Sequence, residues 1–283
     1  MKFMGRYDAL IEKLVQWGGG AAPLLGALVI GSQARADHPA DEFSDLDLVL
    51  VVEDPSYFLQ SDEWLLPVGM PQISFIESTV SGALERRVLF AGGLDVDFVI
   101  LSRDAFRQAA AGGLEILGRG YRILLDKIGL GAFLPPISPA RQPYILLSQQ
   151  QFDNLVNDFW YHAVWSAKKC ARGELRTAKG CVDGHMKHLL RQLVECHSHA
   201  LHGPAYDTWH DGRFLAEWAE GWVVQALPLC YAHFETDDMK RALLETMRLF
   251  HRVAVDTAER LHYEYPHRVH RAATGWVRQA LNP

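Results

Sequence analysis

Two aspartates, Asp45 and Asp47, lie one residue apart where the apolar run Leu46–Val52 begins. Side chains alternate across a β-strand, so both carboxylates are expected on the same face. Two negative charges this close repel each other unless a cation lies between them. Mg²⁺ is the cation that this pattern predicts, because it binds carboxylate oxygens and completes its shell with water and phosphate.

Asp97 offers a third carboxylate for the same site. It lies in the run "LDVDFVIL", in which Asp95 comes two residues earlier on the same face. Three carboxylates from adjacent strands can hold two metal ions about 3.5–4 Å apart, the arrangement used for in-line displacement at phosphorus. We therefore predict a metal site made of Asp45, Asp47 and Asp97.

Gly31 and Ser32 end the apolar run just upstream of the aspartate pair. Gly31 has no side chain, so backbone N–H groups can approach a phosphate closely, and Ser32 adds a hydroxyl donor. Either motif alone is weak, because a Gly-Ser pair is often a simple turn and Asp-x-Asp is often a solvated strand end. Their combination, with twelve residues between Ser32 and Asp45, is far more specific.

The elements that must position these residues are expected to be strands in the first half of the chain. The apolar patterns predict strands at 25–30, 46–52 and 72–78, and a hairpin over 84–101 that turns at Gly92-Gly93. A helix over 7–17 is expected to end at the three glycines that follow it. The first half is therefore α/β in pattern.

The second half of the chain is expected to be helical. The stretch 133–143 contains four of the 13 prolines and is interpreted as a linker. Beyond it, the apolar spacing predicts helices at 147–172, 174–202, 212–225, 237–263 and 267–281. We predict an α+β protein, with a mixed-sheet domain over 1–135 and an all-α helical bundle over 144–283 that binds the substrate.

Composition limits the classes of partner. The net charge of the 283 residues is −6, which disfavours nucleic acid and suits a small cationic substrate. Asp8 and Glu12 argue against a signal peptide, and the longest apolar run, "AAPLLGALVIG", is too short for a membrane span. The four cysteines are interpreted as reduced thiols. We expect a cytoplasmic protein, monomeric or homodimeric, with no membrane partner.

The predicted helix over 147–172 has two contrasting faces. A narrow apolar sector, expected to face the core, contains Phe152, Val156, Phe159, Ala163, Ala167 and Cys170. The opposite sector contains Asp158, Tyr161, Trp165, Lys168 and Arg172. This second face either packs on a neighbouring helix or domain, or closes a cleft, with Lys168 and Arg172 at a triphosphate and Asp158 at the acceptor.

The stretch His185–His202 is rich in histidine. On a helix, His188, Gln192, Glu195, His199 and His202 would share one face. Strong zinc sites usually draw their ligands from separate segments at short spacing. A partly buried polar stripe or a subunit contact is therefore favoured over a zinc site here.

In these motifs the sequence resembles the nucleotidyltransferases of the DNA polymerase β superfamily, whose signature is Gly-Ser, a spacer and Asp-hydrophobic-Asp-hydrophobic. More narrowly, it resembles the aminoglycoside 6-adenylyltransferase (streptomycin adenylyltransferase) family. The stretches that carry this resemblance are "DEFSDLDLVLVVED", "VLFAGGLDVDFVIL" and "NDFWYHAVWSAKKCARGELRTAK". They lie in both halves of the chain.

The resemblance implies transfer of AMP from ATP to a hydroxyl group, the 6-hydroxyl of streptomycin, with release of pyrophosphate and resistance to the antibiotic. Asp45, Asp47 and Asp97 would hold Mg²⁺, and Gly31 and Ser32 would hold phosphate. Asp158, and behind it Asp95, are candidates for a general base. The family often has Arg directly after Gly-Ser; here Gln33 takes that place, and Arg35, Lys168 and Arg172 are the candidate nucleotide contacts.

The acceptor would bind in the second half of the chain. A polycationic antibiotic needs carboxylates, which the second half offers at Glu174, Asp183, Glu195, Asp207, Asp211, Glu217 and Glu220. One alternative keeps the fold and changes the target to another small molecule, a protein or RNA, or to an antitoxin-like partner. Another is a degenerate binding module, which the presence of all three carboxylates disfavours.

Overall fold

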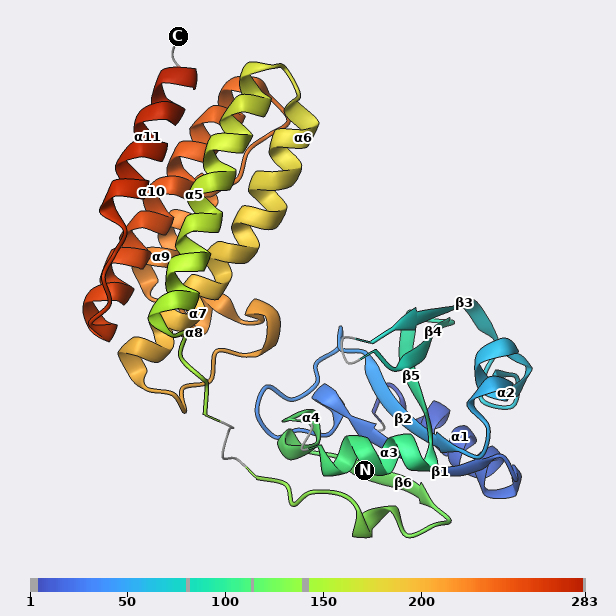
Figure 1. Ribbon diagram of the computed structural model, residues 1–283. Helices are drawn as coiled ribbons and strands as arrows, with labels where there is room; N and C mark the ends of the chain where they lie inside the picture. Colours follow the sequence, from blue (N-terminus) through green and yellow to red (C-terminus); the bar gives the residue numbers. More distant parts are fainter. Residues whose placement is uncertain (1–4, 80–81, 113–114, 139–142, 282–283) are drawn as a thin grey trace. The chain divides into compact units, whose positions relative to one another are not determined.

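Six strands form one mixed sheet in the first half of the chain (Figure 1). The structure is a computed structural model that describes residues 5–79, 82–112, 115–138 and 143–281. The strand order is β3-β4-β5-β2-β1-β6, and β2 pairs with β5 in parallel. The strands are β1 (Leu24–Ile30), β2 (Leu46–Val52), β3 (Pro71–Ser78), β4 (Leu84–Phe90), β5 (Leu94–Ser102) and β6 (Arg122–Asp126).

The strands predicted from the apolar runs are confirmed to within a residue or two, including the hairpin of β4 and β5. Strand β6 was not predicted. Its sequence, Arg122–Asp126, has no strict alternation, and its pairing with β1 joins residues about a hundred positions apart. Such a strand is defined by its partner rather than by its own pattern.

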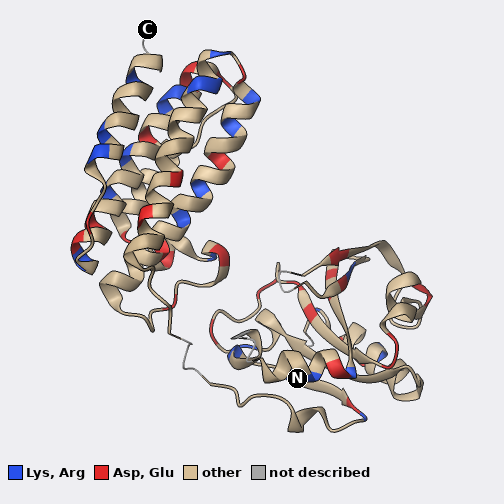
Figure 2. Cartoon of the chain, in the orientation of Figure 1, with Lys and Arg blue, Asp and Glu red and all other residues tan. Residues whose placement is uncertain are grey.

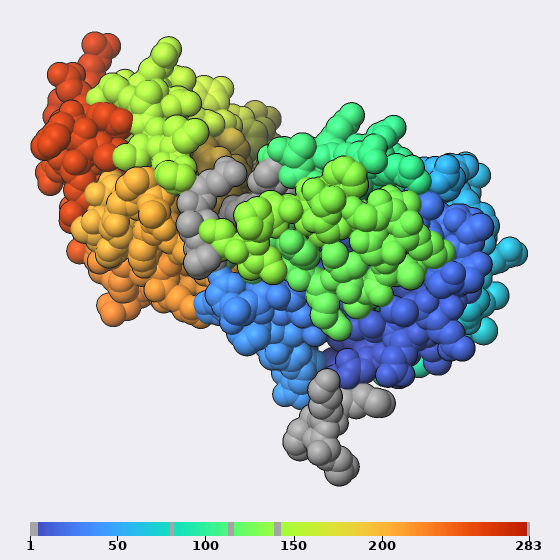
Figure 3. All heavy atoms as spheres, turned by 90° about the horizontal axis from the view of Figure 1, so that it is seen from below, coloured from blue at the N-terminus to red at the C-terminus, as the bar shows by residue number. Residues whose placement is uncertain are grey.

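Helices cover both faces of this sheet, which explains why every residue of β1 is buried. Helices α1 (Asp8–Gly20) and α2 (Pro55–Gln60) pack with Leu48 and Leu50 on one face. Helices α3 (Arg103–Ala111) and α4 (Glu115–Arg119) pack with Val49 and Val51 on the other. Figure 3 shows the molecule from below, where green atoms of the first half of the chain lie beside the blue atoms of its N-terminal part.

Helix α1 differs from the prediction at its end. It continues through Gly18, Gly19 and Gly20 and ends at the extended residue Ala21. Gly18 is buried, and a β-carbon there would lie 2.7 Å from a methyl carbon of Leu24. The glycine therefore allows close packing of the helix on the sheet instead of ending the helix.

The second half of the chain is a helical bundle, so the predicted α+β fold is confirmed (Figure 1). The chain divides into two compact units, Met1–Arg141 and Gln142–Pro283, here called the N-terminal and C-terminal units. The helices of the bundle are α5 (Gln149–Ala171), α6 (Leu175–Gly180), α7 (Lys187–His202), α8 (Leu215–Trp218), α9 (Gly221–Ala226), α10 (Thr236–Leu261) and α11 (His267–Leu281). None of the helices in the described ranges combines the length and apolar character of a membrane span.

Helix α5 presents the predicted apolar sector to the core, and all six of its predicted residues are buried. Ser148 and Gln151 form a capping box that starts the helix. The predicted helix over 212–225 is instead two short helices, α8 and α9, separated by the extended residues Ala219 and Glu220. Hydrogen bonds of Trp218 with Arg213 and Tyr206 hold this break in place.

Candidate metal and phosphate site

Three aspartates meet at one end of the paired strands β2 and β5. The parallel register places Asp47 beside Asp97. Asp45, Asp47 and Asp97 each offer one carboxylate oxygen, and these three oxygens lie within 4.8 Å of one another. Val49 and Val99 follow Asp47 and Asp97 by two residues, so each valine shares a face of the sheet with its aspartate. Both valines pack toward α3, and both carboxylates therefore lie on that face. The structure thus brings the three predicted carboxylates together as a half-buried group.

The electrostatic environment of Asp97 shows that this group is short of positive charge. The pKa of Asp97 is raised to about 6, chiefly by burial; Arg87 opposes this shift, and the charges of Glu85, Asp45 and Asp95 add to it. Nη2 of Arg87 lies 3.3 Å from Oδ2 of Asp97, but the same guanidinium also pairs with Glu77 and Glu85. A bound cation would relieve the remaining repulsion.

Gly31 starts a short 3-10 turn, Gly31–Gln33, directly after β1. Its φ of +69° is unfavourable for any residue with a side chain. A β-carbon on Gly31 would also lie 2.0 Å from Oδ2 of Asp47, which is closer than any contact allows. The turn and the carboxylates can therefore approach each other only because this residue is glycine.

Ser32 and Gln33 complete the turn. Oγ of Ser32 is buried and has no hydrogen-bond partner among the residues that the structure describes. Nε2 of Gln33 donates to the carbonyl oxygen of Asp45 at 3.3 Å, so the residue that departs from the family pattern ties the turn to the aspartate segment. Nε of Arg35 donates to the carbonyl oxygens of Asp37 and His38, within its own loop.

These observations fit a divalent metal ion and a phosphate group. Carboxylate oxygens are the donors that Mg²⁺ prefers, and three of them converge here. The glycine lets the turn pass close to Asp47, and Ser32 of the same turn has a hydroxyl with no hydrogen-bond partner among the described residues. The residues present can therefore hold a metal ion together with a phosphate group.

Tyr7, at the start of α1, is a residue of this site that the sequence did not predict. Its buried hydroxyl lies 3.0 Å from the carbonyl oxygen of Ser44 and 3.1 Å from Oδ1 of Asp95. Burial, followed by the hydrogen bond with Asp95, raises the pKa of Tyr7 above its usual value. Tyr7 thus anchors the segment that leads into Asp45, and nothing in its sequence context distinguishes it from an ordinary core aromatic.

In the C-terminal unit, Asp158 contacts two histidines. Its Oδ1 lies 2.9 Å from Nε2 of His185 and 2.6 Å from Nδ1 of His162. Burial raises the pKa of Asp158, but its hydrogen bonds and charge interactions with His185 and His162 outweigh this effect and lower the pKa overall. These partners were not predicted.

The two predicted basic residues on α5 also have partners within the C-terminal unit. Nζ of Lys168 lies 5.2 Å from the ring centroid of Trp276, and Nε of Arg172 lies 2.8 Å from Oε1 of Glu174. The Arg172 side chain is 71% exposed. Both side chains are therefore accessible, Lys168 on α5 and Arg172 just after its last residue, and their contact with nucleotide stays a prediction.

The carboxylates of the C-terminal unit are largely paired with basic side chains. Figure 2 shows Lys and Arg interspersed with Asp and Glu along its helices. Ion pairs or histidine contacts engage many of the acidic residues proposed for a cationic substrate, among them Glu174, Asp183, Glu195, Asp211 and Glu220. A cationic ligand would have to displace or share these partners.

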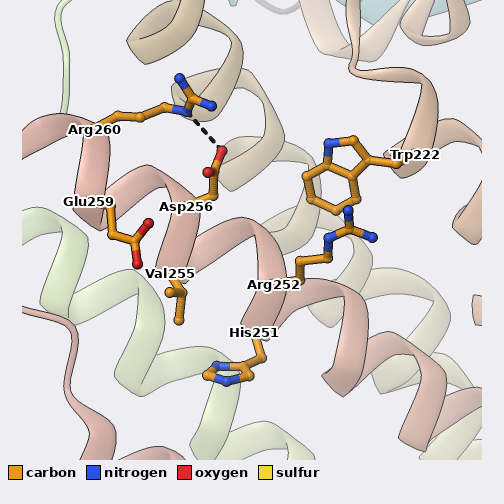
Figure 4. Close-up of a pocket in the computed structure, with 7 residues that line it drawn as sticks. All are labelled: Trp222, His251, Arg252, Val255, Asp256, Glu259 and Arg260. Atoms are coloured by element: carbon orange, nitrogen blue, oxygen red, sulfur yellow. Dashed lines mark hydrogen bonds and ion pairs between the residues drawn. The ribbon is translucent and has the colours of Figure 1, made fainter.

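Two hollows lie in the C-terminal unit. Figure 4 shows the first, of about 440 Å³, where side chains of α10 face Trp222. The Arg252 guanidinium lies 3.9 Å from the Trp222 ring centroid, and Asp256 pairs with Arg260. The second hollow, of about 300 Å³, includes Lys187, and burial lowers the pKa of that amine to about 8.

The histidine-rich helix α7 forms a polar packing stripe rather than a ligand set along the face that the sequence suggested. His199 is buried, stacks on Tyr144 with ring centroids 4.0 Å apart, and lies 3.1 Å from Oγ1 of Thr208. His202 pairs with Glu220. Only His185 of this stretch joins a group of potential metal ligands among the described residues, and its partners come from α5.

Comparison with known proteins gives consistent matches. A family model described as streptomycin adenylyltransferase matches residues 6–280. An aminoglycoside 6-adenylyltransferase of Campylobacter jejuni is 22% identical over 244 residues, which cover 83% of this chain and 82% of that protein. One of Bacillus subtilis (strain 168) is 22% identical over 245 residues, covering 83% and 84%. A crystal structure of an aminoglycoside 6-adenyltransferase from Bacillus subtilis aligns with a TM-score of 0.47 at 18% identity, covering 97% of this chain and 98% of that one.

Proposed function

The chain belongs to the streptomycin adenylyltransferase family, and from this premise we propose that it transfers AMP from ATP to a hydroxyl group of an aminoglycoside. The reaction would be Mg²⁺-dependent and would release pyrophosphate. The names of the two relatives point to the 6-position as the acceptor. The observation that carries the proposal is the convergence of Asp45, Asp47 and Asp97 beside the turn at Gly31.

In this reaction the acceptor oxygen forms a bond to the α-phosphorus, the bond from that phosphorus to the pyrophosphate oxygen breaks, and the hydroxyl proton leaves. Asp45, Asp47 and Asp97 would hold Mg²⁺, which when bound supplies positive charge to the phosphate oxygens and lowers the pKa of an acceptor hydroxyl. The N–H groups of the turn at Gly31 and the hydroxyl of Ser32 would donate to the outer phosphates.

For the group that accepts the hydroxyl proton, we favour Asp95 over Asp158. Asp95 shares β5 with Asp97, is exposed, and is oriented by the Tyr7 hydroxyl, while Asp158 is engaged by two imidazoles. The role predicted for Asp158 stays a prediction. The variants Asp95→Asn and Asp158→Asn test which carboxylate accepts the proton. Loss of the base lowers turnover while ATP binding is retained.

The C-terminal unit would supply the remaining contacts. Lys168 and Arg172 are accessible and are our proposal for the residues that contact the triphosphate. A cationic antibiotic would bind to carboxylates and aromatic rings of the bundle. The hollow beside Trp222 is lined by groups of both kinds. Arg35, in the loop that follows the Gly31 turn, remains a proposed contact of the nucleotide.

The experiment is direct. Purified protein is mixed with Mg²⁺, labelled ATP and a panel of aminoglycosides, and pyrophosphate release is followed. We expect release with streptomycin, transfer of label to the antibiotic and no release when Mg²⁺ is chelated. No release with any aminoglycoside, together with label on a protein or on RNA, would instead support the alternative that this fold modifies a macromolecule.

A further inference from the structure

A second group of potential metal ligands lies in the C-terminal unit, apart from the three aspartates of the sheet. It consists of Asp158, His162 and His185, whose ligand atoms all lie within 4.8 Å of one another. Asp158 and His162 are one turn apart on α5, so their side chains project from the same side of the helix. The rings of His162 and His185 have centroids 4.2 Å apart.

His185 reaches this group from a π-helical turn. The turn, Cys181–Met186, interrupts the otherwise continuous helix between α6 and α7. A π turn adds a residue to the helical repeat and rotates the side chains that follow it, and such turns occur frequently at functional sites. In this chain the turn directs His185 toward α5, away from the stripe formed by the later histidines of α7.

The group is accessible and has the donor types of a transition-metal site. The exposed fractions of the side chains are 38% for Asp158, 29% for His162 and 41% for His185. Two imidazole nitrogens and one carboxylate oxygen are ligands that Zn²⁺ and its neighbours prefer over Mg²⁺, which selects oxygen. Three protein ligands also leave a coordination position for water or an external group.

The geometry requires only a small adjustment. In a tetrahedral site with metal–ligand distances of about 2.0–2.2 Å, neighbouring donor atoms are roughly 3.3 Å apart. The present distances from Oδ1 of Asp158 are 2.6 Å to Nδ1 of His162 and 2.9 Å to Nε2 of His185. An opening of less than about 1 Å, through rotation of partly exposed side chains, would bring these two distances to the tetrahedral value.

We propose that Asp158, His162 and His185 form a binding site for a divalent transition metal ion, with Zn²⁺ as the representative, separate from the carboxylate site of the N-terminal unit. The site does not depend on the proposed adenylyl transfer. With an ion bound, the Asp158 carboxylate is a ligand, so the acceptance of the hydroxyl proton falls to another group.

The test is a titration of the full-length protein with ZnCl₂ in excess Mg²⁺, followed by calorimetry, and with CoCl₂, followed by visible absorption. We expect one saturable Zn²⁺ site per chain and a Co²⁺ spectrum typical of a site with four or five ligands. The variants His185→Asn and His162→Asn should each weaken binding by at least about 10-fold, because each removes a direct ligand. Far-UV circular dichroism confirms that each variant is folded.

Two matched variants make the result decisive. His188→Asn changes an exposed histidine less than one turn from His185 that contacts Gln192, and it should bind Zn²⁺ as the parent does. Asp47→Asn disables the carboxylate site and should also leave Zn²⁺ binding unchanged. The proposal is overturned if the parent binds no Zn²⁺, if His185→Asn binds as tightly as the parent, or if His188→Asn is weakened equally, which would indicate adventitious surface histidines.

Discussion

The backbone of Gly31 packs directly against the carboxylate of Asp47, so closely that a β-carbon at Gly31 would lie 2.0 Å from Oδ2 of Asp47. The register explains this proximity, because Ile30 at the end of β1 is paired with Asp47 on β2. The residue after Ile30 must therefore pass beside the carboxylate. The candidate phosphate turn and the candidate metal site are thus one structural unit.

Gly31→Ala is expected to disable the enzyme without unfolding it. Relief of the 2.0 Å contact requires a shift of roughly 1 Å or more, and a misplacement of that size near reacting groups costs about 100-fold in rate. The measurement is kcat/KM for pyrophosphate release with ATP and streptomycin. Gly92→Ala is the control, because Gly92 has a similar φ of +79° but no atom within 4 Å of the position that a β-carbon would take. Equal activities of the two variants would show that the Gly31–Asp47 contact is unimportant.

Asp47→Asn tests the metal assignment. Asparagine keeps the size of the side chain and removes one of the three charges that converge here. We expect turnover to fall by about 1000-fold or more, because the amide is a poor Mg²⁺ ligand. The midpoint of urea unfolding should stay close to that of the parent. Asp104→Asn, at the exposed start of α3, is the matched control and should retain full turnover. Near-normal turnover of Asp47→Asn would refute the assignment.

The sequence predicted the strands and the aspartate trio because both depend on local pattern. Apolar runs with carboxylates at their starts identify β2 and β5, and adjacent strands bring such residues together. The contacts of Arg87 with Asp97 and of Tyr7 with Asp95 were not predictable. They depend on strand register and on packing between residues 10 and 88 positions apart.

The helical half shows a second limit of sequence reasoning. A uniform rotation of about 100° per residue correctly identified the buried sector of α5. The π turn Cys181–Met186 interrupts this regular rotation, and from it His185 reaches Asp158. No residue pattern in the chain predicts that turn, so the three-residue ligand group emerges only in the folded structure.

Phe159→Ala is expected to destabilise the bundle strongly. Phe159 of α5 stacks on Phe250 of α10 with ring centroids 3.6 Å apart, and both rings are fully buried. Removal of a buried aromatic ring leaves a cavity and costs about 3–5 kcal/mol in the free energy of unfolding. Urea unfolding followed by far-UV circular dichroism measures the change. Tyr161→Ala, on the exposed side of the same helix, should change the free energy by less than about 0.5 kcal/mol. Equal losses for the two variants would contradict the assigned core.

The stacked pair His251 and His270 makes the bundle sensitive to acid. Their ring centroids are 3.7 Å apart. Burial, followed by the charges of His251, His267, Arg271 and Arg278, lowers the pKa of His270 to about 4, and burial lowers the pKa of His251 as well. In the unfolded chain a histidine titrates near pH 6.5. Between about pH 6.5 and pH 4 the unfolded state therefore binds more protons than the folded state.

The free energy of unfolding should accordingly fall as the pH is lowered through this range, and this group should contribute no pH dependence above it. His270→Phe keeps a ring against His251 and Trp160 but cannot take up a proton. We expect it to reduce the acid-induced loss by roughly 1 kcal/mol, after allowance for the solvent around a half-buried ring. Urea midpoints at several pH values between 7 and 4 measure the slope. The exposed His210, changed to Phe, should leave the slope unchanged, and an unchanged slope in His270→Phe would exclude His270 as its source.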